Sequence, residues 1–307
     1  MQNLNNLNNR DNGDNVDNGD NNMNDDFGDR MKKFESFETS QCFMPMLPIV
    51  IRLDGRSFSD YTNGLEKPFD MAFRRAMLET TKRLVEETNA VMGYTQSDEI
   101  TLVLYSDNMT SQTWFNGEKF KIVSCLASLC SVTLDRIMHP YFCGMNIIEK
   151  PPTFDCRAYN VPSKMEAANA LLWREMDAQK NSISTAARFY YSHKELDRKN
   201  SAQKVEMLLA RGITFEDYPD IFKRGAFVQR KKTIRKFTTN EIEFLPLRHE
   251  ARTNPALVVE RTDVVEIKMS KFSYVANRVE VVFEGADPVM PFYSPVGAPI
   301  NWIIPKS

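Results

Sequence analysis

Two aspartates stand where paired carboxylates could bind a divalent cation. Asp54 directly follows the strand-like run 48–53, and Asp98 lies in a short turn between two further strand-like runs. The chain has only three histidines, so carboxylate oxygens are the available ligands, and these suit a hard ion such as Mg²⁺. Gly55 allows a backbone carbonyl or a phosphate to approach closely. Such a set of groups suits two-metal phosphoryl or nucleotidyl transfer, in which the ions hold the attacking and leaving oxygens.

The elements predicted around these aspartates place them at one end of a sheet. Hydrophobic patterns predict the order β-α-β-β-α-β, over residues 48–53, 67–88, 91–96, 100–105, 118–138 and 153–161. This order predicts an α+β fold with the split βαβ, ferredoxin-like arrangement, in which the third strand lies between the first two. Asp54 and Asp98 then lie on neighbouring strands about 4.8 Å apart, where they repel each other unless a cation lies between them. From spacing alone, an ordinary Asp-Gly turn and an ordinary hairpin turn remain the alternative.

The remaining residues divide into a polar tail and C-terminal additions. Eighteen of the first 30 residues are Asn or Asp, which predicts a disordered segment because so little apolar surface can be buried. Further helices are expected at about 163–180 and 194–210, and β-rich runs over 240–285, including VEVVF at 279–283. We therefore predict a disordered tail (1–30), a catalytic domain (46–162), a helical and basic segment (163–239) and a β-rich C-terminal extension (240–307).

A basic stripe covers residues 221–239. It contains seven lysines and arginines, no acid, and three interleaved phenylalanines. Such a stripe suits binding of a nucleic-acid phosphate backbone. A merely solvated basic edge is the simpler alternative.

Composition and charge exclude several classes of protein. The net charge is −2, and the tail carries seven Asp and two Arg, so the rest of the chain is about +3 and mildly basic. The five cysteines form no C-x-x-C pair, which argues against a disulfide framework and predicts a reducing, cytoplasmic compartment. No run of 18 apolar residues is present, so we expect no membrane span. The N-terminus lacks the apolar core of a signal peptide.

Seven blocks of the sequence, in one order, resemble the motifs of the tRNA-His guanylyltransferase family and its relatives, the 3′-to-5′ RNA polymerases. They are DGRSF (54–58), EKPFD (66–70), GYTQSDE (93–99), KIVS (121–124), PTFDCR (152–157), LWREMDAQKN (172–181) and GITFEDYPDIFKRGAF (212–227). The resemblance covers about residues 47–232. It implies a palm-like catalytic domain, a tetramer, and addition of nucleotides to the 5′ end of tRNA with two Mg²⁺ ions. In this family ATP or GTP first activates the 5′ end, which the 3′-hydroxyl of an incoming NTP then attacks.

The resemblance also implies the site residues. The family's metal ligands are two aspartates and a glycine carbonyl, which match Asp54, Gly55 and Asp98. Glu99 stands beside them, either as a catalytic acid or as an exposed acid of the turn. Nucleotide binding is expected from Arg56, Ser57, Phe58, Ser59, Lys67, Ser97 and Lys121. Lys121 also begins a predicted helix, whose free N–H groups favour anions. For both lysines a solvated helix position is the alternative.

RNA binding is expected from polar residues farther along the chain. They are Arg157, Asn181, Lys223, Arg224, Arg230 and Lys231. Strand alternation puts Arg157 on the polar face of the fourth strand, where an ion pair with Asp155 is the alternative. Asn181 matches an asparagine of the family, and a helix-surface pair with Asp177 is the alternative.

Two positions depart from the family pattern. Family members that act on tRNA-His have histidines where Ser59 and Gln179 stand. The chain is therefore more similar to the branch that repairs 5′-truncated RNAs by templated addition than to enzymes that add a single guanylate to tRNA-His. Two other classes of function remain open: a palm-fold nucleotide cyclase or signalling-nucleotide synthase, and a non-catalytic tRNA-binding protein.

Overall fold

The computed structural model describes residues 19–109, 113–145, 150–254 and 256–291. The chain divides into two compact units, Met1–Gln41 and Cys42–Ser307. The first contains helix α1 (Gly19–Thr39), and the second contains the other described elements. Within the described ranges, no helix has the length and apolar character needed to cross a membrane.

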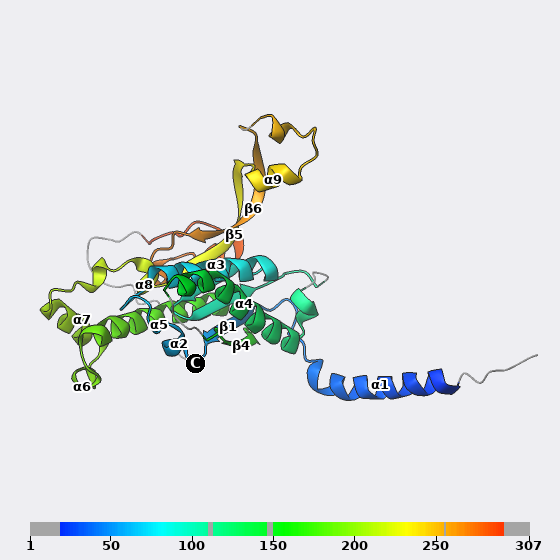
Figure 1. Cartoon of the computed structure of the whole chain (residues 1–307), viewed down its shortest axis with the longest axis horizontal. Helices are drawn as coiled ribbons and strands as arrows, with labels where there is room; N and C mark the ends of the chain where they lie inside the picture. Colours follow the sequence, from blue (N-terminus) through cyan, green and yellow to red (C-terminus); the bar gives the residue numbers. More distant parts are fainter. Residues whose placement is uncertain (1–18, 110–112, 146–149, 255, 292–307) are drawn as a thin grey trace, which may run out of the picture. The chain divides into compact units, whose positions relative to one another are not determined.

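One antiparallel six-stranded sheet organises the second unit (Figure 1). Its order is β4-β1-β3-β2-β5-β6. The strands are β1 (Ile49–Gly55), β2 (Met92–Gln96), β3 (Glu99–Leu104), β4 (Phe154–Asn160), β5 (Ala226–Lys236) and β6 (Val258–Ile267). The four predicted strands are confirmed to within a residue or two, and β3 lies between β1 and β2 as expected. The fold is therefore a mixed α/β structure built on an antiparallel sheet.

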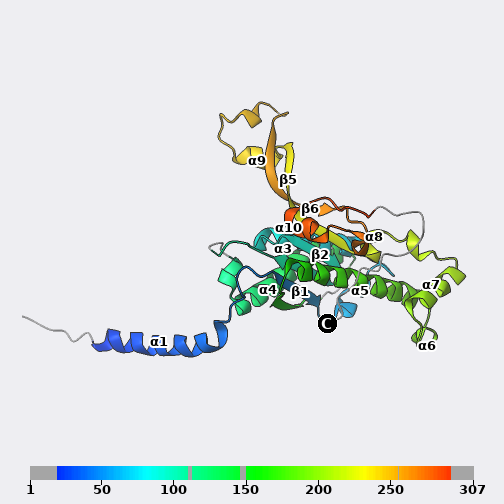
Figure 2. The ribbon, with the colours of Figure 1, turned by 180° about the vertical axis from the view of Figure 1, so that it is seen from behind.

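Helices cover both faces of the sheet. Helices α3 (Met71–Thr88) and α4 (Lys119–Met145) pack on one face (Figure 1), and α5 (Lys164–Tyr190) on the other (Figure 2). Alternation along β1 divides the core, because Ile51 packs with the α3–α4 face and Val50 with the α5 face. Burial of each such aliphatic side chain contributes about 1.5–3 kcal/mol, which fixes the strand register and with it the position of the strand ends.

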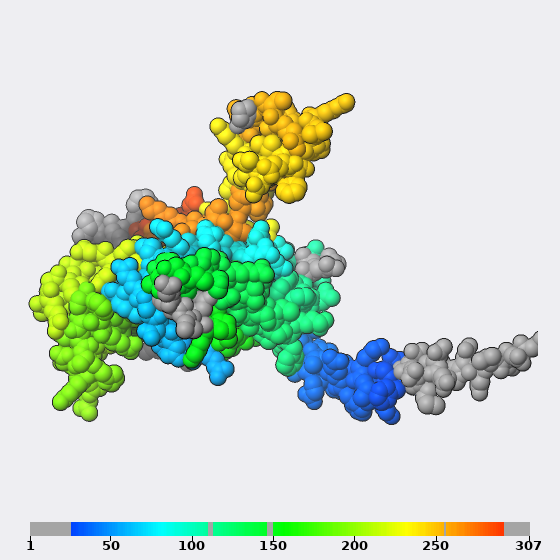
Figure 3. Space-filling view, viewed as in Figure 1, coloured from blue at the N-terminus to red at the C-terminus, as the bar shows by residue number. Residues whose placement is uncertain are grey.

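Strands β5 and β6 form a long hairpin that extends beyond the sheet. β5 pairs with β2 only over Ala226–Val228, yet it pairs with β6 from Phe227 to Lys236. The described residues of the connection between the two strands, 237–254 and 256–257, form the yellow lobe in Figures 1 and 3. The domain boundary expected between residues 239 and 240 therefore falls inside this hairpin.

Short helices complete the described residues. They are α2 (Phe58–Tyr61), α6 (His193–Leu196), α7 (Ser201–Ala210), α8 (Asp220–Lys223), α9 (Thr239–Phe244) and α10 (Arg278–Glu284). The predicted single helix over 194–210 is wrong, because α6 and α7 are separate. Ser192 and Asn200 each begin a helix with its own capping box, which places a break between the two helices.

The VEVVF run at 279–283 is helical, which corrects the expectation of a strand there. It lies in α10, which ends at Gly285 in the left-handed conformation. Val281 and Val282 are adjacent and buried against the α5 side of the core. Tertiary packing of these two valines therefore overrides their strand propensity.

Part of the predicted disordered tail is also helical. Residues 19–30 belong to α1, whereas residues 1–18 lie outside the described residues. Phe27, Met31 and Phe34 recur at spacings of four and three, and Asp29 pairs with Lys32 at 3.3 Å. The prediction from composition failed here because it averaged the polar start of the segment with this periodic part.

Candidate active site

The two predicted carboxylate positions meet at one edge of the sheet. Asp54 is the last residue but one of β1 and lies opposite Glu99 of β3 and Asp155 of β4. The Gly55 N–H donates a hydrogen bond to the backbone oxygen of Asp98 at 3.1 Å. The structure therefore brings together the backbone of Asp54, Gly55, Asp98 and Glu99, as the strand order predicted.

Acidic charge is concentrated at this edge. Burial raises the pKa of Asp98, and the charge of Asp54 raises it further. Burial also raises the pKa of Glu99; Arg174 opposes this change, while Asp54 adds to it. A cation between the carboxylates would offset both the burial and the repulsion.

The donor set fits Mg²⁺ with a bound substrate. Within the described parts of the chain, no three Asp, Glu, His or Cys side chains form a metal-binding group. Mg²⁺ is commonly held by one or two carboxylates together with water and substrate phosphates, rather than by an all-protein cage. Asp54, Asp98 and the Gly55 carbonyl match that partial set.

The loop after Asp54 is tightly packed. A Cβ on Gly55 would lie 2.4 Å from the Phe58 ring, and that ring packs against Tyr61 and Phe154 with centroids 5.0 Å apart in each case. Ser57 has a φ of 56°, in the left-handed region. A glycine is therefore required at 55 by close packing, and the predicted nucleotide-binding residues 56–59 leave the strand in a sharp turn.

A buried arginine holds the turn that carries Asp98. Arg74 donates to the Ser97 carbonyl at 3.0 Å and to the Ile221 carbonyl at 2.7 Å. Its burial lowers its pKa to about 10. Ser97 has a φ of 54°, so the turn is also conformationally unusual. Sequence reasoning missed Arg74, although a cation between Phe73 and Met77 on the apolar face of a predicted helix was a signal.

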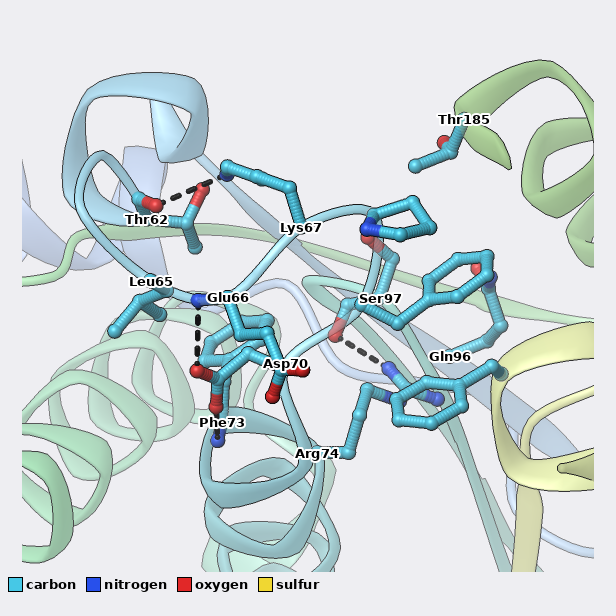
Figure 4. Close-up of a pocket in the computed structure, with 13 residues that line it drawn as sticks. Thr62, Leu65, Glu66, Lys67, Asp70, Phe73, Arg74, Gln96, Ser97 and Thr185 are labelled. Carbon is cyan, nitrogen blue, oxygen red and sulfur yellow. Dashed lines mark hydrogen bonds between the residues drawn. The ribbon is translucent and has the colours of Figure 1, made fainter. Parts of the chain in front are cut away.

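A cavity of about 140 Å³ opens beside this turn (Figure 4). It is lined by the EKPFD block, by Ser97, by Arg74 and by Phe222, whose ring stacks on that of Phe69 with centroids 4.9 Å apart. Lys67 donates to the Thr62 carbonyl at 3.0 Å. The cavity therefore brings two predicted nucleotide-binding residues, Lys67 and Ser97, next to the acidic edge.

The carboxylate of Asp70, which caps α3, also lines this cavity. Asp70 accepts hydrogen bonds from the backbone N–H groups of Phe73 at 2.8 Å and Glu66 at 3.0 Å (Figure 4). Within the EKPFD block, Asp70 therefore fixes the conformation of the loop. This role was not predicted from the sequence.

A second buried arginine reaches Glu99 from the opposite face. Arg174 of α5 is paired with Glu99 and also with Asp177 at 3.1 Å. Asn181 donates to Asp177 at 3.2 Å, so the helix-surface pair considered for Asn181 is present. Asn181 is thus linked to the acidic edge through a chain of contacts, and Arg174 is a further residue that the sequence did not single out.

Several predicted RNA-binding cations are engaged within the chain. Arg157 pairs with Asp155 at 3.0 Å, which is the ion pair considered as the alternative to RNA binding. Lys223 is buried, and its ammonium group donates to the Glu216 carbonyl at 2.6 Å. Arg224 donates to Asp220 at 2.6 Å. The side chains of Lys223 and Arg224 thus support the local structure and do not form a free cationic surface.

The other basic side chains lie farther along β5 and on α4. Arg230 bonds to Asn89, and Lys231 pairs with Asp287 at 3.2 Å. Lys121 pairs with Glu118 at 2.9 Å near the start of α4.

Within one chain, Lys121 lies far from the acidic edge, so its predicted contact with a nucleotide stays a prediction. Helix α4 follows β3, so it begins at the opposite end of the sheet and reaches the DGRSF loop only at Phe142, which contacts Tyr61 at 5.2 Å. Twenty-one residues of helix separate Lys121 from Phe142, or about 32 Å.

Comparison with known proteins identifies relatives of the chain. The profile of the tRNA(His) guanylyltransferase family matches residues 28–162. The Saccharomyces cerevisiae tRNA(His) guanylyltransferase is 28% identical over 212 residues, which cover 64% of this chain and 88% of the yeast protein. A bacterial tRNA(His) guanylyltransferase-like protein in complex with ATP is 34% identical, with a TM-score of 0.62 over 67% of this chain and 87% of its own. A GTP complex of such a bacterial protein is 32% identical, with a TM-score of 0.56 over 67% of this chain and 86% of its own.

Proposed function

Because this chain belongs to the tRNA(His) guanylyltransferase family of nucleotidyltransferases, we propose that it adds nucleotides to the 5′ end of a tRNA in the 3′-5′ direction. One observation carries the proposal: Asp54, Gly55 and Asp98 meet at a sheet edge beside a cavity lined by Lys67 and Ser97. The bacterial relatives of known structure were solved with ATP and with GTP, which supports ATP or GTP as the activating nucleotide. We further propose that the β-α-β-β-α-β core is a palm-like, ferredoxin-like catalytic domain; the position of β3 between β1 and β2 supports this.

The residues of the acidic edge would hold two Mg²⁺ ions through Asp54, Asp98 and the Gly55 carbonyl. When bound, the ions would lower the pKa of the attacking hydroxyl and neutralise the triphosphate. The chain itself orients these ligands: Arg74 fixes the turn of Asp98 through the Ser97 carbonyl. Arg174 keeps Glu99 paired on the opposite face, so that Glu99 supports the site instead of competing as a ligand.

The loop and cavity would bind the nucleotide. The backbone of residues 55–58 turns sharply next to Asp54, so the N–H groups of Ser57 and Phe58 and the Arg56 side chain can approach phosphates. The N–H groups of Gly55 and Arg56 already donate to the carbonyls of Asp98 and Thr153. Lys67 lies in the cavity wall and can exchange its contact with the Thr62 carbonyl for one with a phosphate oxygen.

The RNA substrate is expected to be a 5′-truncated or 5′-incomplete tRNA. Ser59 and Gln179 replace histidines of enzymes that act on tRNA-His, which favours templated repair. Lys232 of β5 is a candidate contact for the RNA backbone, because its side chain is 77% exposed and its ion pair with Glu260, at 3.0 Å, lies at the surface where a phosphate can compete for it. We further propose a cytoplasmic homotetramer, on family resemblance.

A labelled-nucleotide assay tests the function. The full chain is incubated with Mg²⁺, labelled NTPs and a panel of 5′-phosphorylated tRNAs that lack one or more 5′ nucleotides. We expect label in RNA only when tRNA is present, loss of incorporation in Asp54→Asn and Asp98→Asn, and normal incorporation in the matched control Asp60→Asn, an exposed acid of α2.

Two results would refute the proposal. A cyclic or dinucleotide product formed without RNA would identify a cyclase or signalling-nucleotide synthase. Binding of tRNA without any incorporation, unaffected by the two aspartate substitutions, would identify a non-catalytic RNA-binding protein.

A further inference from the structure

We propose that the indole ring of Trp173, on α5, is a stacking platform for an unpaired base of the RNA substrate. The base belongs to the strand opposite the 5′ end that receives nucleotides. This inference rests on the proposed function, because a tRNA that lacks 5′ nucleotides leaves the nucleotides that faced them unpaired. It gives the RNA a contact of its own, outside the cavity lined by Lys67 and Ser97.

Trp173 exposes a large aromatic surface. The residue is 52% exposed, although tryptophan is highly buried on average in folded proteins. Leu171 and Glu175, two residues before and after it on α5, are buried, so the side chain of Trp173 points away from the core. Packing in the core therefore does not explain why an aromatic ring stands at this position.

The exposed ring is held in one orientation by the arginine beside it. The guanidinium carbon of Arg174 lies over the ring, 4.7 Å from its centroid. Arg174 is buried, and it is fixed by ion pairs with Glu99 and, at 3.1 Å, with Asp177. One face of the indole thus packs on a fixed cation, and the exposed remainder of the ring is open to a base. A preorganised surface of this kind binds at a smaller entropic cost than a mobile side chain.

The ring lies close enough to the acidic edge to hold a base at the same end of the RNA. A charge-assisted hydrogen bond from Arg174 places the Glu99 carboxylate about 4 Å beyond the guanidinium carbon. With the 4.7 Å from that carbon to the ring centroid, the ring is within roughly 9 Å of Glu99, which lies opposite Asp54 in the strand register. Stacked nucleotides rise about 3.4 Å each along a strand, so two or three nucleotides span this distance.

The edge strand β4 leaves a polar face open on the same side of the sheet. Alternate residues of β4, beginning at Phe154, pack with the α3–α4 core. The residues between them, Asp155, Arg157 and Tyr159, therefore face the α5 side, and they are exposed. Arg157 is 58% exposed, so a phosphate can compete with Asp155 for its guanidinium group. This side of the sheet thus offers a cation and a second aromatic ring, a combination found in proteins that bind single-stranded nucleic acids.

The charges around the ring favour an RNA base over a protein partner. Arg174 packs on the ring, and two acids, Glu99 and Asp177, pair with this arginine. The cores of protein interfaces are depleted of charged residues. Sites for single-stranded nucleic acid instead combine aromatic rings with arginine, because every base has a face that can stack.

Equilibrium binding of two RNAs to the full chain tests the stacking. The first RNA is a 5′-phosphorylated tRNA that lacks its first 5′ nucleotide, and the second is the same RNA with its 3′ strand trimmed to a blunt end. We expect Trp173→Ala to raise the Kd of the first RNA roughly 5- to 150-fold, which corresponds to one lost base stack, and to leave that of the blunt RNA unchanged. Trp173→Phe should restore most of the affinity, because phenylalanine keeps an aromatic face.

Phe189 supplies a matched control. It is also 52% exposed and lies on the same helix, near its C-terminal end. Phe189→Ala should leave the Kd of both RNAs unchanged, and far-ultraviolet circular dichroism should match the wild type in all variants.

A fluorescent base locates the contact. An aminopurine replaces the unpaired nucleotide opposite the missing 5′ nucleotide, and stacking on an indole quenches its fluorescence. We expect quenching by the wild type and by Asp54→Asn, and loss of quenching with Trp173→Ala. Binding and quenching need no incorporation of nucleotide. Absence of incorporation with quenching retained would therefore refute the proposed function and not the base contact.

Three results would overturn the inference. Equal weakening of both RNAs by Trp173→Ala would assign the ring a structural role in holding Arg174. Unchanged binding of both RNAs would show that no base stacks on the ring. A lower molar mass of Trp173→Ala than of the wild type in light scattering would assign the ring to an interface between copies of the chain.

Discussion

Replacement of Arg74 by methionine distinguishes two roles of this side chain, which are to hold the turn that carries Asp98 and to stabilise the fold. The side chain is 5% exposed and donates to two backbone carbonyls, those of Ser97 and Ile221. Hydrogen bonds from a charged group contribute roughly 1.5–3 kcal/mol each, so the loss is about 3–6 kcal/mol. Burial lowers the pKa of Arg74 from 12.5 to about 10, which corresponds to about 3 kcal/mol of unfavourable charge burial that methionine avoids.

The two effects partly cancel in the free energy of unfolding. We expect Arg74→Met to lose only about 0–3 kcal/mol by denaturant unfolding, because methionine is also similar in volume. Activity should fall more, since the turn that carries Asp98 loses its anchor. Misplacement of a reacting group by about 1 Å costs roughly 100-fold, so we expect a decrease in kcat of roughly 10- to 100-fold.

The neighbouring arginine supplies a matched control. Arg75 is exposed on the same helix turn, so Arg75→Met should leave both unfolding and nucleotide incorporation close to the wild type. If Arg74→Met incorporates nucleotide as fast as Arg75→Met, the account of Arg74 as the anchor of the turn is wrong.

Two further predictions concern close packing and pH. Gly55→Ala should destabilise the chain by about 1–3 kcal/mol in denaturant unfolding, because the new Cβ meets the confined Phe58 ring, whereas Gly144→Ala, with open space around it, should not. A lower free energy of unfolding for Gly144→Ala, together with an unchanged one for Gly55→Ala, would contradict the packing argument. Burial raises the pKa of Glu175, against the opposing effects of the Phe272 N–H and Arg224, so the folded state holds this proton more tightly than the unfolded state. Glu175 therefore contributes stability below its ordinary pKa of 4.5, and this stability is lost as the pH rises through the raised pKa. The variant Glu175→Gln should remove this part of the pH dependence of unfolding. Identical pH dependence in the wild type and Glu175→Gln would contradict this assignment.

The sheet and the acidic edge could be predicted from the sequence because their determinants are local. Alternation in the strand runs, a two-residue turn before Glu99 and the β-α-β-β-α-β order fix which strand ends share an edge. Asp54 and Asp98 followed from that order alone. The same reasoning, carried one step farther, would have placed Lys121 at the opposite end, since a helix that follows β3 begins there.

The contacts that complete the site could not be predicted in this way, because their partners are distant in the sequence. Arg74 reaches Ile221, and Arg174 reaches Glu99, across gaps of 147 and 75 residues. Arg224 was predicted to contact RNA from its charge, but charge does not reveal that Glu175 and Asp220 lie beside it. Likewise, β5 and β6 are separated in the sequence by residues 237–257, and no local pattern indicates that the two strands pair.

The central claim is that Asp54 and Asp98 together hold divalent cations beside a triphosphate. Electron paramagnetic resonance can count bound Mn²⁺ in the presence of a non-hydrolysable GTP analogue. For a two-metal site we expect two ions per chain in the wild type and in Asp60→Asn, with binding weakened in Asp54→Asn and in Asp98→Asn. Unchanged number and affinity of bound ions in both single variants would contradict the account.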